Sequence, residues 1–180
     1  MQIDFIAAFD RASHFGLLYK LRNVGVGGAV FDVIAGFISG RVQRVLVDGI
    51  RSENVRVVSG IPQGSVLGPL LFLLYTSDLP ITPENTLVGY ADDSSLLAEV
   101  SEPGNRVQTV LSLNCDLARI GDWCKRWGML VNPMKTKALV ISRSRTLEPN
   151  FPNLVLDGTV VERVTELKVL GVVLDTKLLF

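Results

Sequence analysis

The sequence predicts an α+β fold in which an antiparallel sheet carries helices packed on one face. Three observations support this prediction. Apolar residues between positions 107 and 127 recur at intervals of three and four, as on one face of a long helix. Several β-rich runs are joined by short polar turns, as in hairpins. The order of predicted elements, with helices between a first strand, two hairpins and further strands, fits the same class, and no segment is repeated.

The N-terminal half begins with a short apolar segment that predicts a strand presenting Asp4. Residues 13–21 and 29–38 have apolar side chains at helical spacing, and glycines separate the two predicted helices. Residues 41–58 predict a hairpin that turns at Asp48-Gly49. The hairpin carries four arginines, which are Arg41, Arg44, Arg51 and Arg56. These arginines fit a solvated face and a nucleic-acid contact about equally well.

The C-terminal part is also predicted to contain both helices and strands. Residues 64–75 predict a buried helix with Pro69 in its first turns, and residues 107–127 predict the long amphipathic helix. Residues 137–142 predict a strand, and residues 153–161 predict a hairpin that turns at an Asp-Gly pair. Residues 168–174 predict a final strand.

The composition limits the possible classes of protein. The chain has 180 residues, 48% of them apolar and 20% charged, so it is long and apolar enough to form a core. The formal net charge of zero argues against tight duplex binding by this chain alone. The longest apolar run is too short to span a bilayer and no signal peptide is evident, so no membrane partner is expected. Cys115 and Cys124 are expected to be reduced core thiols.

Two adjacent carboxylates, Asp92 and Asp93, follow the apolar run 87–90 and precede a second β-rich run, 94–98. This pattern predicts a strand, a tight turn and a strand, with the acids at the tip. A polar hairpin turn that has no catalytic or metal-binding role shows the same pattern. If the strand that presents Asp4 lies alongside, the three carboxylates form a self-repelling cluster. Divalent cations commonly bridge such clusters in phosphoryl transfer.

Five segments stand out along the chain. They are residues 4–10 (DFIAAFD), 59–69 (SGIPQGSVLGP), 90–93 (YADD), 127–137 (WGMLVNPMKTK) and 167–175 (LKVLGVVLD). In this order they resemble motifs A to E of reverse transcriptases in the form used by non-LTR (LINE-like, jockey-like) retrotransposons. The resemblance implies a reverse transcriptase palm with a partial fingers segment over residues 1–175, and the start of a thumb at 176–180. It also implies that the rest of the fingers, the thumb and an endonuclease domain lie outside this chain.

The resemblance implies an RNA-directed DNA polymerase that transfers a nucleotide from a dNTP to the 3′-hydroxyl of a DNA primer on an RNA template. Two Mg²⁺ ions, with Mn²⁺ as a substitute, are expected as cofactors. Asp4 and Asp92 are expected to bridge them, with Asp93 in support and the main-chain carbonyl of Phe5 as a further ligand. An intracellular location, in the nucleus or cytoplasm, is expected from the family.

Further residues match family positions that contact the nucleotide or primer. Phe9 matches the steric gate that favours deoxynucleotides, although a core aromatic residue fits its position too. Ala8 leaves room for the sugar, while Gln63 and Gly64 match positions that line the nucleotide site. The primer grip matches Leu170 and Gly171.

Two basic side chains have competing interpretations. Lys135 matches the motif D lysine, a candidate proton donor to the leaving pyrophosphate, but Lys137 is its rival, and each also fits a solvated strand edge. The single histidine, His14, is expected to cap or pack a helix rather than act as an acid or base.

Two other functions compete with the polymerase. An inactive retroelement remnant that lacks fingers and thumb has the same motifs. A reverse transcriptase of the group II intron or retron type shares the acidic hairpin, although residues 59–69 and the Ala-Phe-Asp of motif A look more like the retrotransposon kind.

Overall fold

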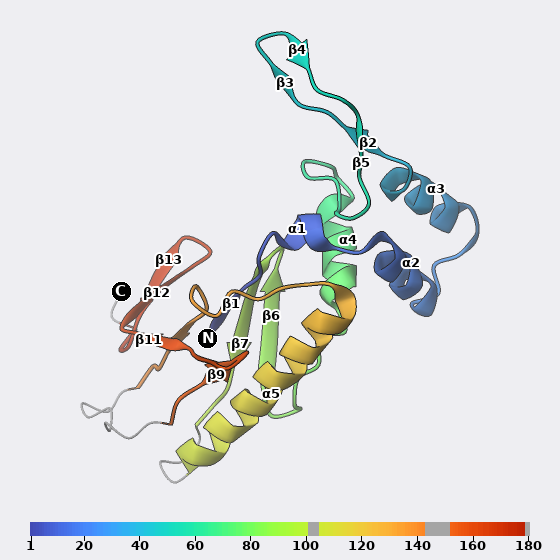
Figure 1. Cartoon of the computed structure of the whole chain (residues 1–180). Helices are drawn as coiled ribbons and strands as arrows, with labels where there is room; N and C mark the ends of the chain where they lie inside the picture. The colour runs from blue at the N-terminus through green and yellow to red at the C-terminus, as the bar shows by residue number, and fades with distance from the viewer. Residues whose placement is uncertain (101–104, 143–151, 179–180) are drawn as a thin grey trace. The chain divides into compact units, whose positions relative to one another are not determined.

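The computed structural model describes residues 1–100, 105–142 and 152–178 and divides the chain into two compact units (Figure 1). The first unit comprises Met1–Ile6 and Leu79–Phe180, and the second comprises Ala7–Asp78. None of the helices in the described ranges is long and apolar enough to cross a membrane.

A five-stranded sheet forms the centre of the first unit. Its strands, in spatial order, are β11 (Glu162–Val164), β8 (Lys137–Leu139), β1 (Gln2–Asp4), β7 (Asp93–Leu97) and β6 (Thr86–Tyr90). The central strand β1 pairs antiparallel with both neighbours, and only β11 joins the sheet in parallel. The predicted α+β class with an antiparallel sheet is therefore confirmed.

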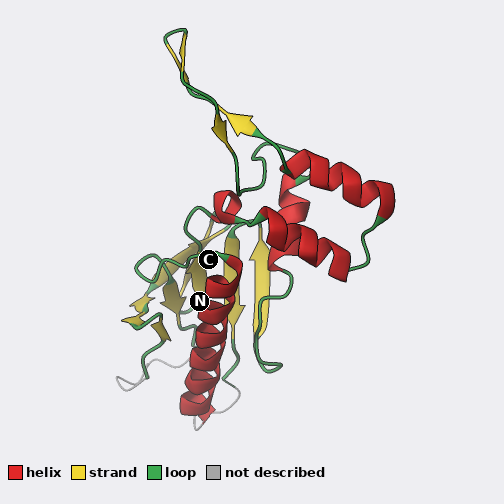
Figure 2. Cartoon of the chain, turned by 45° about the vertical axis from the view of Figure 1, so that its right-hand side comes forward, coloured by secondary structure: helices red, strands yellow, loops and turns green. Residues whose placement is uncertain are grey.

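One long helix, α5 (Arg106–Trp127), lies along this sheet, as Figures 1 and 2 both show. Its predicted apolar face is buried at Val110, Leu117, Ile120 and Cys124. Val107, in the first turn of the helix, belongs to the same predicted face but is exposed. The helix ends at Gly128, whose left-handed φ of 73° supplies the conformation that commonly caps helices.

Four short strands complete the first unit as two hairpins. The first pairs β9 (Val155–Leu156) with β10 (Thr159–Val160), as predicted. The second pairs β12 (Glu166–Val169) with β13 (Val172–Asp175). The single strand predicted for residues 168–174 is therefore wrong. Leu170 and Gly171 have φ of 48° and 87°, and positive φ at two central residues makes a tight hairpin turn.

Two other expectations for this unit need correction. The strand predicted at residues 137–142 ends earlier, because only Lys137–Leu139 pairs with its neighbours. Cys124 is buried as expected, whereas Cys115 is an exposed thiol rather than a core one. Burial raises the pKa of the Cys124 thiol to about 12, with a further contribution from the negative charge of Asp157.

The second unit contains four helices, which are α1 (Ala8–Arg11), α2 (His14–Asn23), α3 (Gly28–Ile38) and α4 (Gly68–Thr76). The helices predicted at 13–21 and 29–38 are confirmed as α2 and α3. The Ser13 side chain accepts a hydrogen bond from the Gly16 amide and so caps α2. Lys20 is buried, donates to the Tyr75 carbonyl at 2.6 Å and pairs with Asp78. Desolvation lowers the pKa of Lys20, and the bond to Asp78 opposes that effect.

The helix predicted at residues 64–75 begins later than expected. The α4 helix starts at Gly68, and Pro69 occupies its first turn, where a missing amide proton costs nothing. Gly64 has a φ of 75°, which is incompatible with a helix at that position.

The arginine-bearing hairpin is confirmed as a two-part ribbon. It consists of β2 (Val42–Gln43), β3 (Leu46–Val47), β4 (Ile50–Arg51) and β5 (Val55–Arg56). β3 pairs with β4 across the Asp48-Gly49 turn, and β2 pairs with β5 closer to the helices.

Candidate active site

The adjacent carboxylates lie at the tip of a tight hairpin in the first unit. β6 ends at Tyr90 and β7 begins at Asp93, so Ala91 and Asp92 form a two-residue turn. Ala91 has a left-handed φ of 52°, which costs a non-glycine residue about 1–2 kcal/mol. The Asp92 and Asp93 side chains are both exposed.

Asp4 lies directly opposite Asp93 in the sheet. The two residues are register partners of the antiparallel pair β1 and β7, so their side chains project from the same face. Directly opposed side chains have Cβ atoms about 5 Å apart, and like charges in that arrangement destabilise the sheet. Gln2 lies on the same face and donates a hydrogen bond from Nε2 to Asp93 Oδ1 at 3.0 Å.

This pair has the donor chemistry that a hard divalent cation requires, and Asp92 is the next residue in the turn. Within the residues that the structure describes, however, no group of three His, Cys, Asp or Glu side chains is arranged to hold a metal ion. The structure thus brings two of the three predicted carboxylates into register, and the cluster of three stays a prediction.

The backbone around Asp4 is fixed by the segment that follows α5. The Asp4 amide donates to Thr136 Oγ1 at 3.3 Å, and the Asp4 carbonyl accepts from the Asn132 amide at 2.7 Å. Phe5, which is buried, bridges Val131. Motif D therefore holds the strand end that presents Asp4.

The two competing lysines differ in their contacts. Lys137 donates to the Met134 carbonyl at 3.0 Å and forms an ion pair with Glu162. Lys135 is exposed, and its ammonium group has no hydrogen bond or ion pair with any described residue. Of the two lysines, Lys135 is therefore the one whose ammonium group is not engaged by a described residue.

Sequence reasoning missed the buried acid Asp116. Its side chain is fully buried, and its two oxygens accept hydrogen bonds from the Thr82 amide at 2.7 Å and from Asn85 Nδ2 at 2.6 Å. Thr82 and Asn85 precede β6, so Asp116 ties α5 to the strand that leads to the acidic hairpin. The sequence could have indicated a buried carboxylate here, because Asp116 lies beside Leu117 on the apolar face of the helix predicted at residues 107–127.

The residues that match nucleotide-contacting positions lie in the second unit. Phe9, Gln63 and Gly64 line one cavity of about 440 Å³. One face of the Phe9 ring stacks on Phe72, with ring centroids 4.6 Å apart and an angle of 17° between the planes. Phe9 is thus partly a packing residue and partly a cavity wall. Ala8 is buried and does not line that cavity.

The segment from Phe9 to His14 holds motif B through its backbone. The Gly60 amide donates to the Ala12 carbonyl and the Ile61 amide donates to the Phe9 carbonyl, both at 2.8 Å. Gly60 has a φ of 94°, and a Cβ there would come within 3.0 Å of the Asp10 backbone. His14 Nε2 lies 2.9 Å from the Gly60 carbonyl oxygen. That contact links His14, the first residue of α2, to motif B.

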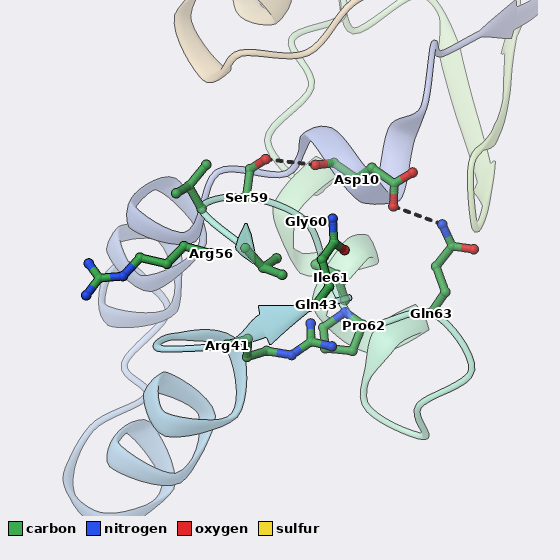
Figure 3. Close-up of a pocket in the computed structure, with 11 residues that line it drawn as sticks. Asp10, Arg41, Gln43, Arg56, Ser59, Gly60, Ile61, Pro62 and Gln63 are labelled. Atoms are coloured by element: carbon green, nitrogen blue, oxygen red, sulfur yellow. Dashed lines mark hydrogen bonds between the residues drawn. The ribbon is translucent and has the colours of Figure 1, made fainter. Parts of the chain in front are cut away.

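Side chains add two further links between the same segments. Ser59 Oγ donates to the Asp10 carbonyl at 3.0 Å, and Gln63 Nε2 donates to Asp10 Oδ1 at 3.0 Å (Figure 3). The Asp10 carboxylate therefore engages the NH₂ group of the Gln63 side-chain amide. The amide oxygen of Gln63 remains available to accept a hydrogen bond from a ligand.

Comparison with known proteins decides the family. A family model described as reverse transcriptase (RNA-dependent DNA polymerase) matches residues 1–174. This chain belongs to the reverse transcriptase family. The reverse transcriptase motifs identified in the sequence all fall within the matched region or at its end.

Several relatives of this reverse transcriptase chain come from mobile elements. It is 31% identical over 185 residues to the RNA-directed DNA polymerase from mobile element jockey of Drosophila funebris. It is 33% identical over 189 residues to a probable RNA-directed DNA polymerase from transposon BS of Drosophila melanogaster. Each match covers 99% of this chain but 20% of the relative. The chain therefore spans about a fifth of the length of these relatives.

A more distant relative is the Pol polyprotein of the type-1 retrotransposable element R2 of Popillia japonica, 23% identical over 177 residues. These relatives are named for a mobile element, a transposon and a retrotransposable element, so the comparisons support the retrotransposon interpretation over a group II intron or retron enzyme. Divalent metals are general cofactors of the family.

The primer-grip candidates, Leu170 and Gly171, lie at the exposed turn between β12 and β13.

Proposed function

We propose that this chain is the catalytic region of an RNA-directed DNA polymerase that acts in retrotransposition. It binds an RNA template, a DNA primer and dNTPs, and adds nucleotides to the primer 3′-hydroxyl. The observation that carries the proposal is the register pairing of Asp4 with Asp93 beside the Asp92 turn. Self-repelling carboxylates on one face are a costly arrangement unless cations offset the repulsion.

The proposal assigns Asp4, Asp92 and the Phe5 carbonyl as the ligands of two Mg²⁺ ions, with Asp93 in support. When bound, such ions lower the pKa of the primer 3′-hydroxyl and stabilise charge that develops on the phosphate. Asp93 accepts a hydrogen bond from Gln2, and that bond orients its carboxylate in the pair.

Other residues of the chain orient the substrates and move a proton. Lys135 donates a proton to the leaving pyrophosphate, which its exposed ammonium group is free to approach. Phe9 excludes a ribose 2′-hydroxyl through the ring face that lines the cavity, and Gln63 and Gly64 contact the nucleotide. Leu170 and Gly171 contact the primer strand.

The test is Mg²⁺-dependent dNTP incorporation on a primed RNA template by a longer protein that contains this chain as its reverse transcriptase domain. Asp92→Asn should lower the incorporation rate by at least about 10³-fold, because it removes charge from the proposed metal ligands. Asp122→Asn is the matched control, since Asp122 is an exposed acid that forms an ion pair with Lys125 on the surface of α5. Equal rates for the two variants would remove Asp92 from the mechanism.

A further inference from the structure

The carboxylate of Asp10 has no role in the chemistry described so far. It belongs to the short helix α1 and directly follows Phe9. Phe9 and Gln63 line the cavity of about 440 Å³ to which the proposed function assigns the incoming nucleotide, whereas Asp10 does not line it. The Asp10 side chain nevertheless reaches that cavity wall, because Gln63 Nε2 donates to Asp10 Oδ1 at 3.0 Å (Figure 3).

The motif B loop is held in place without this carboxylate. Two backbone amides of the loop donate to carbonyls within residues 9–12, both at 2.8 Å. Ser59 Oγ adds a hydrogen bond to the Asp10 carbonyl at 3.0 Å, and that main-chain oxygen is retained whatever the side chain at position 10. The Asp10 carboxylate therefore acts on the Gln63 side chain rather than on the path of the loop.

The chemistry of this hydrogen bond determines how the Gln63 amide is oriented. A side-chain amide has an NH₂ end that donates and an oxygen that accepts, and rotation of the amide exchanges the two. An ionised carboxylate accepts hydrogen bonds and cannot donate one, so Asp10 bonds only the NH₂ end. Gln63 is exposed, and an exposed glutamine without such a partner samples several rotamers. The carboxylate thus selects an orientation in which the amide oxygen is left for a ligand.

We propose that Asp10 is a positioning residue for nucleotide binding, which holds the Gln63 amide so that its oxygen meets a hydrogen-bond donor of the incoming dNTP. A dNTP carries such donors on its sugar and on its base. Asp10 itself touches no substrate. The inference rests on the proposed function, which places the dNTP in the Phe9 cavity. Because the contact forms when the dNTP binds, it contributes to dNTP affinity and not to the rate of the chemical step.

The experiment measures single-turnover incorporation of one dNTP by a longer protein that contains this chain. It gives the apparent Kd of the dNTP and the maximal rate separately. The variants are Asp10→Ala, Asp10→Asn, Gln63→Ala and the double variant Asp10→Ala, Gln63→Ala. Asp32→Ala is the matched control, since Asp32 is an exposed acid on α3 in the same unit. Thermal melting of each variant checks that the fold is retained.

Asp10→Ala is expected to raise the Kd of the dNTP about fivefold and to leave the maximal rate within about twofold, because a released Gln63 spends less time in the competent orientation. Asp10→Asn should raise the Kd about twofold, since asparagine accepts from Gln63 in one orientation and donates to it in the other. Gln63→Ala should raise the Kd about tenfold, as for one lost hydrogen bond. The double variant should match Gln63→Ala, because Asp10 acts only through Gln63.

Additive losses in the double variant would show that Asp10 acts independently of Gln63 and would overturn the proposal. A lower maximal rate with an unchanged Kd, or equal effects of Asp10→Ala and Asp32→Ala, would overturn it too. If Asp10→Ala does not fold, the cycle of Asp10→Asn with Gln63→Ala applies the same criterion. An active wild type with an unaffected Asp10→Ala variant removes the role of Asp10 alone, whereas an inactive wild type removes the proposed function as well.

Discussion

Asp4 and Asp93 are the residue pair on which the proposed chemistry depends most directly. Their register places two negative charges on one face of the sheet, with Gln2 as a hydrogen-bond donor to one of them. Such a pair is unfavourable for folding and favourable for binding a cation. A site of this kind lowers the folding stability but favours cation binding, and the two effects can be measured separately.

Asp93→Asn should raise the free energy of unfolding by about 0.5 kcal/mol in the absence of metal, because it removes like-charge repulsion. The substituted amide retains an oxygen that can accept from Gln2, so that hydrogen bond is kept. The same change should reduce the stabilisation that added Mg²⁺ gives. Urea denaturation with EDTA and with Mg²⁺ measures both effects, and Asp122→Asn is the control for removal of a surface charge. A lower stability of Asp93→Asn in EDTA would contradict the prediction.

Phe9→Val, made in a longer active protein that contains this chain, should admit ribonucleotides. The smaller side chain removes the ring wall that the proposal places against a 2′-hydroxyl. Primer extension with matched rNTP and dNTP gives the discrimination ratio, which we expect to fall by at least about tenfold. Because Phe9 also stacks on Phe72, a thermal melt must accompany the assay. An unchanged ratio would leave Phe9 as a packing residue alone.

At the residue scale, the sequence identified Asp4, Asp92 and Asp93 as candidate ligands on neighbouring strands but did not determine the register in which those strands pair. The register of β1 against β7 depends on pairing between residues about 90 positions apart, and a shift of one residue would turn Asp4 to the other face. The contact between Gln63 and Asp10 has the same long-range origin. Short motifs identify residue types, whereas the facing partner is set by the folded sheet and loops.

At the scale of elements, long periodic segments were predictable and short ones were not. The α5 helix was predicted to within one residue at its start because its apolar spacing persists over about six turns. The hairpin of β12 and β13 was mistaken for one strand, since Leu170 is an apolar residue in a left-handed conformation that the sequence does not signal. The late start of α4 follows from Pro69 and the positive φ of Gly64, which periodicity alone does not reveal.

Asp116→Ala should destabilise the first unit by about 2–4 kcal/mol, because it leaves the Thr82 amide and the Asn85 side chain without their acceptor in a buried place. The loop before β6 should loosen as a result. Urea denaturation gives the stability, and hydrogen exchange of the β6 amides reports the local effect. Asp122→Ala on the exposed side of α5 is the matched control and should cost under about 0.5 kcal/mol. Equal costs for the two variants would show that the network does not hold β6.

At the scale of the whole chain, much apolar surface is exposed within the second unit. Ile50, Val58 and Val66 are 77%, 80% and 96% exposed, and Val30 and Val33 on α3 are 62% and 67% exposed. Val30 and Val33 lie one turn apart on α3, and exposed apolar side chains grouped on one helix face commonly mark a surface where other protein packs. The relatives are about five times longer than this chain, and surfaces of this kind are where further protein is expected to pack.

The chain alone should therefore self-associate. Light scattering or sedimentation of the purified 180-residue chain should show species larger than its 19.7 kDa monomer, increasing with concentration. Val30→Lys with Val33→Lys should reduce that association, since charge on an exposed helix face opposes apolar contact. Asn23→Lys, on the exposed end of α2, is a control that adds charge outside the apolar patch. Association that is unaffected by the α3 substitutions would exclude this helix as the contact.

The chain alone should also incorporate dNTP on a primed RNA template far more slowly than a full-length relative. The carboxylates supply cation ligands, but positioning of primer, template and triphosphate supplies most of the rate in phosphoryl transfer. This chain spans about a fifth of the length of its relatives, and the rest of each relative is protein that could hold those substrates. The assay compares the 180-residue chain with its Asp92→Ala, Asp93→Ala variant in Mg²⁺. Robust incorporation that this variant abolishes would show that the two units suffice for catalysis. The exposed ribbon and α3 would then need another explanation, such as docking of nucleic acid or of a second copy of the chain.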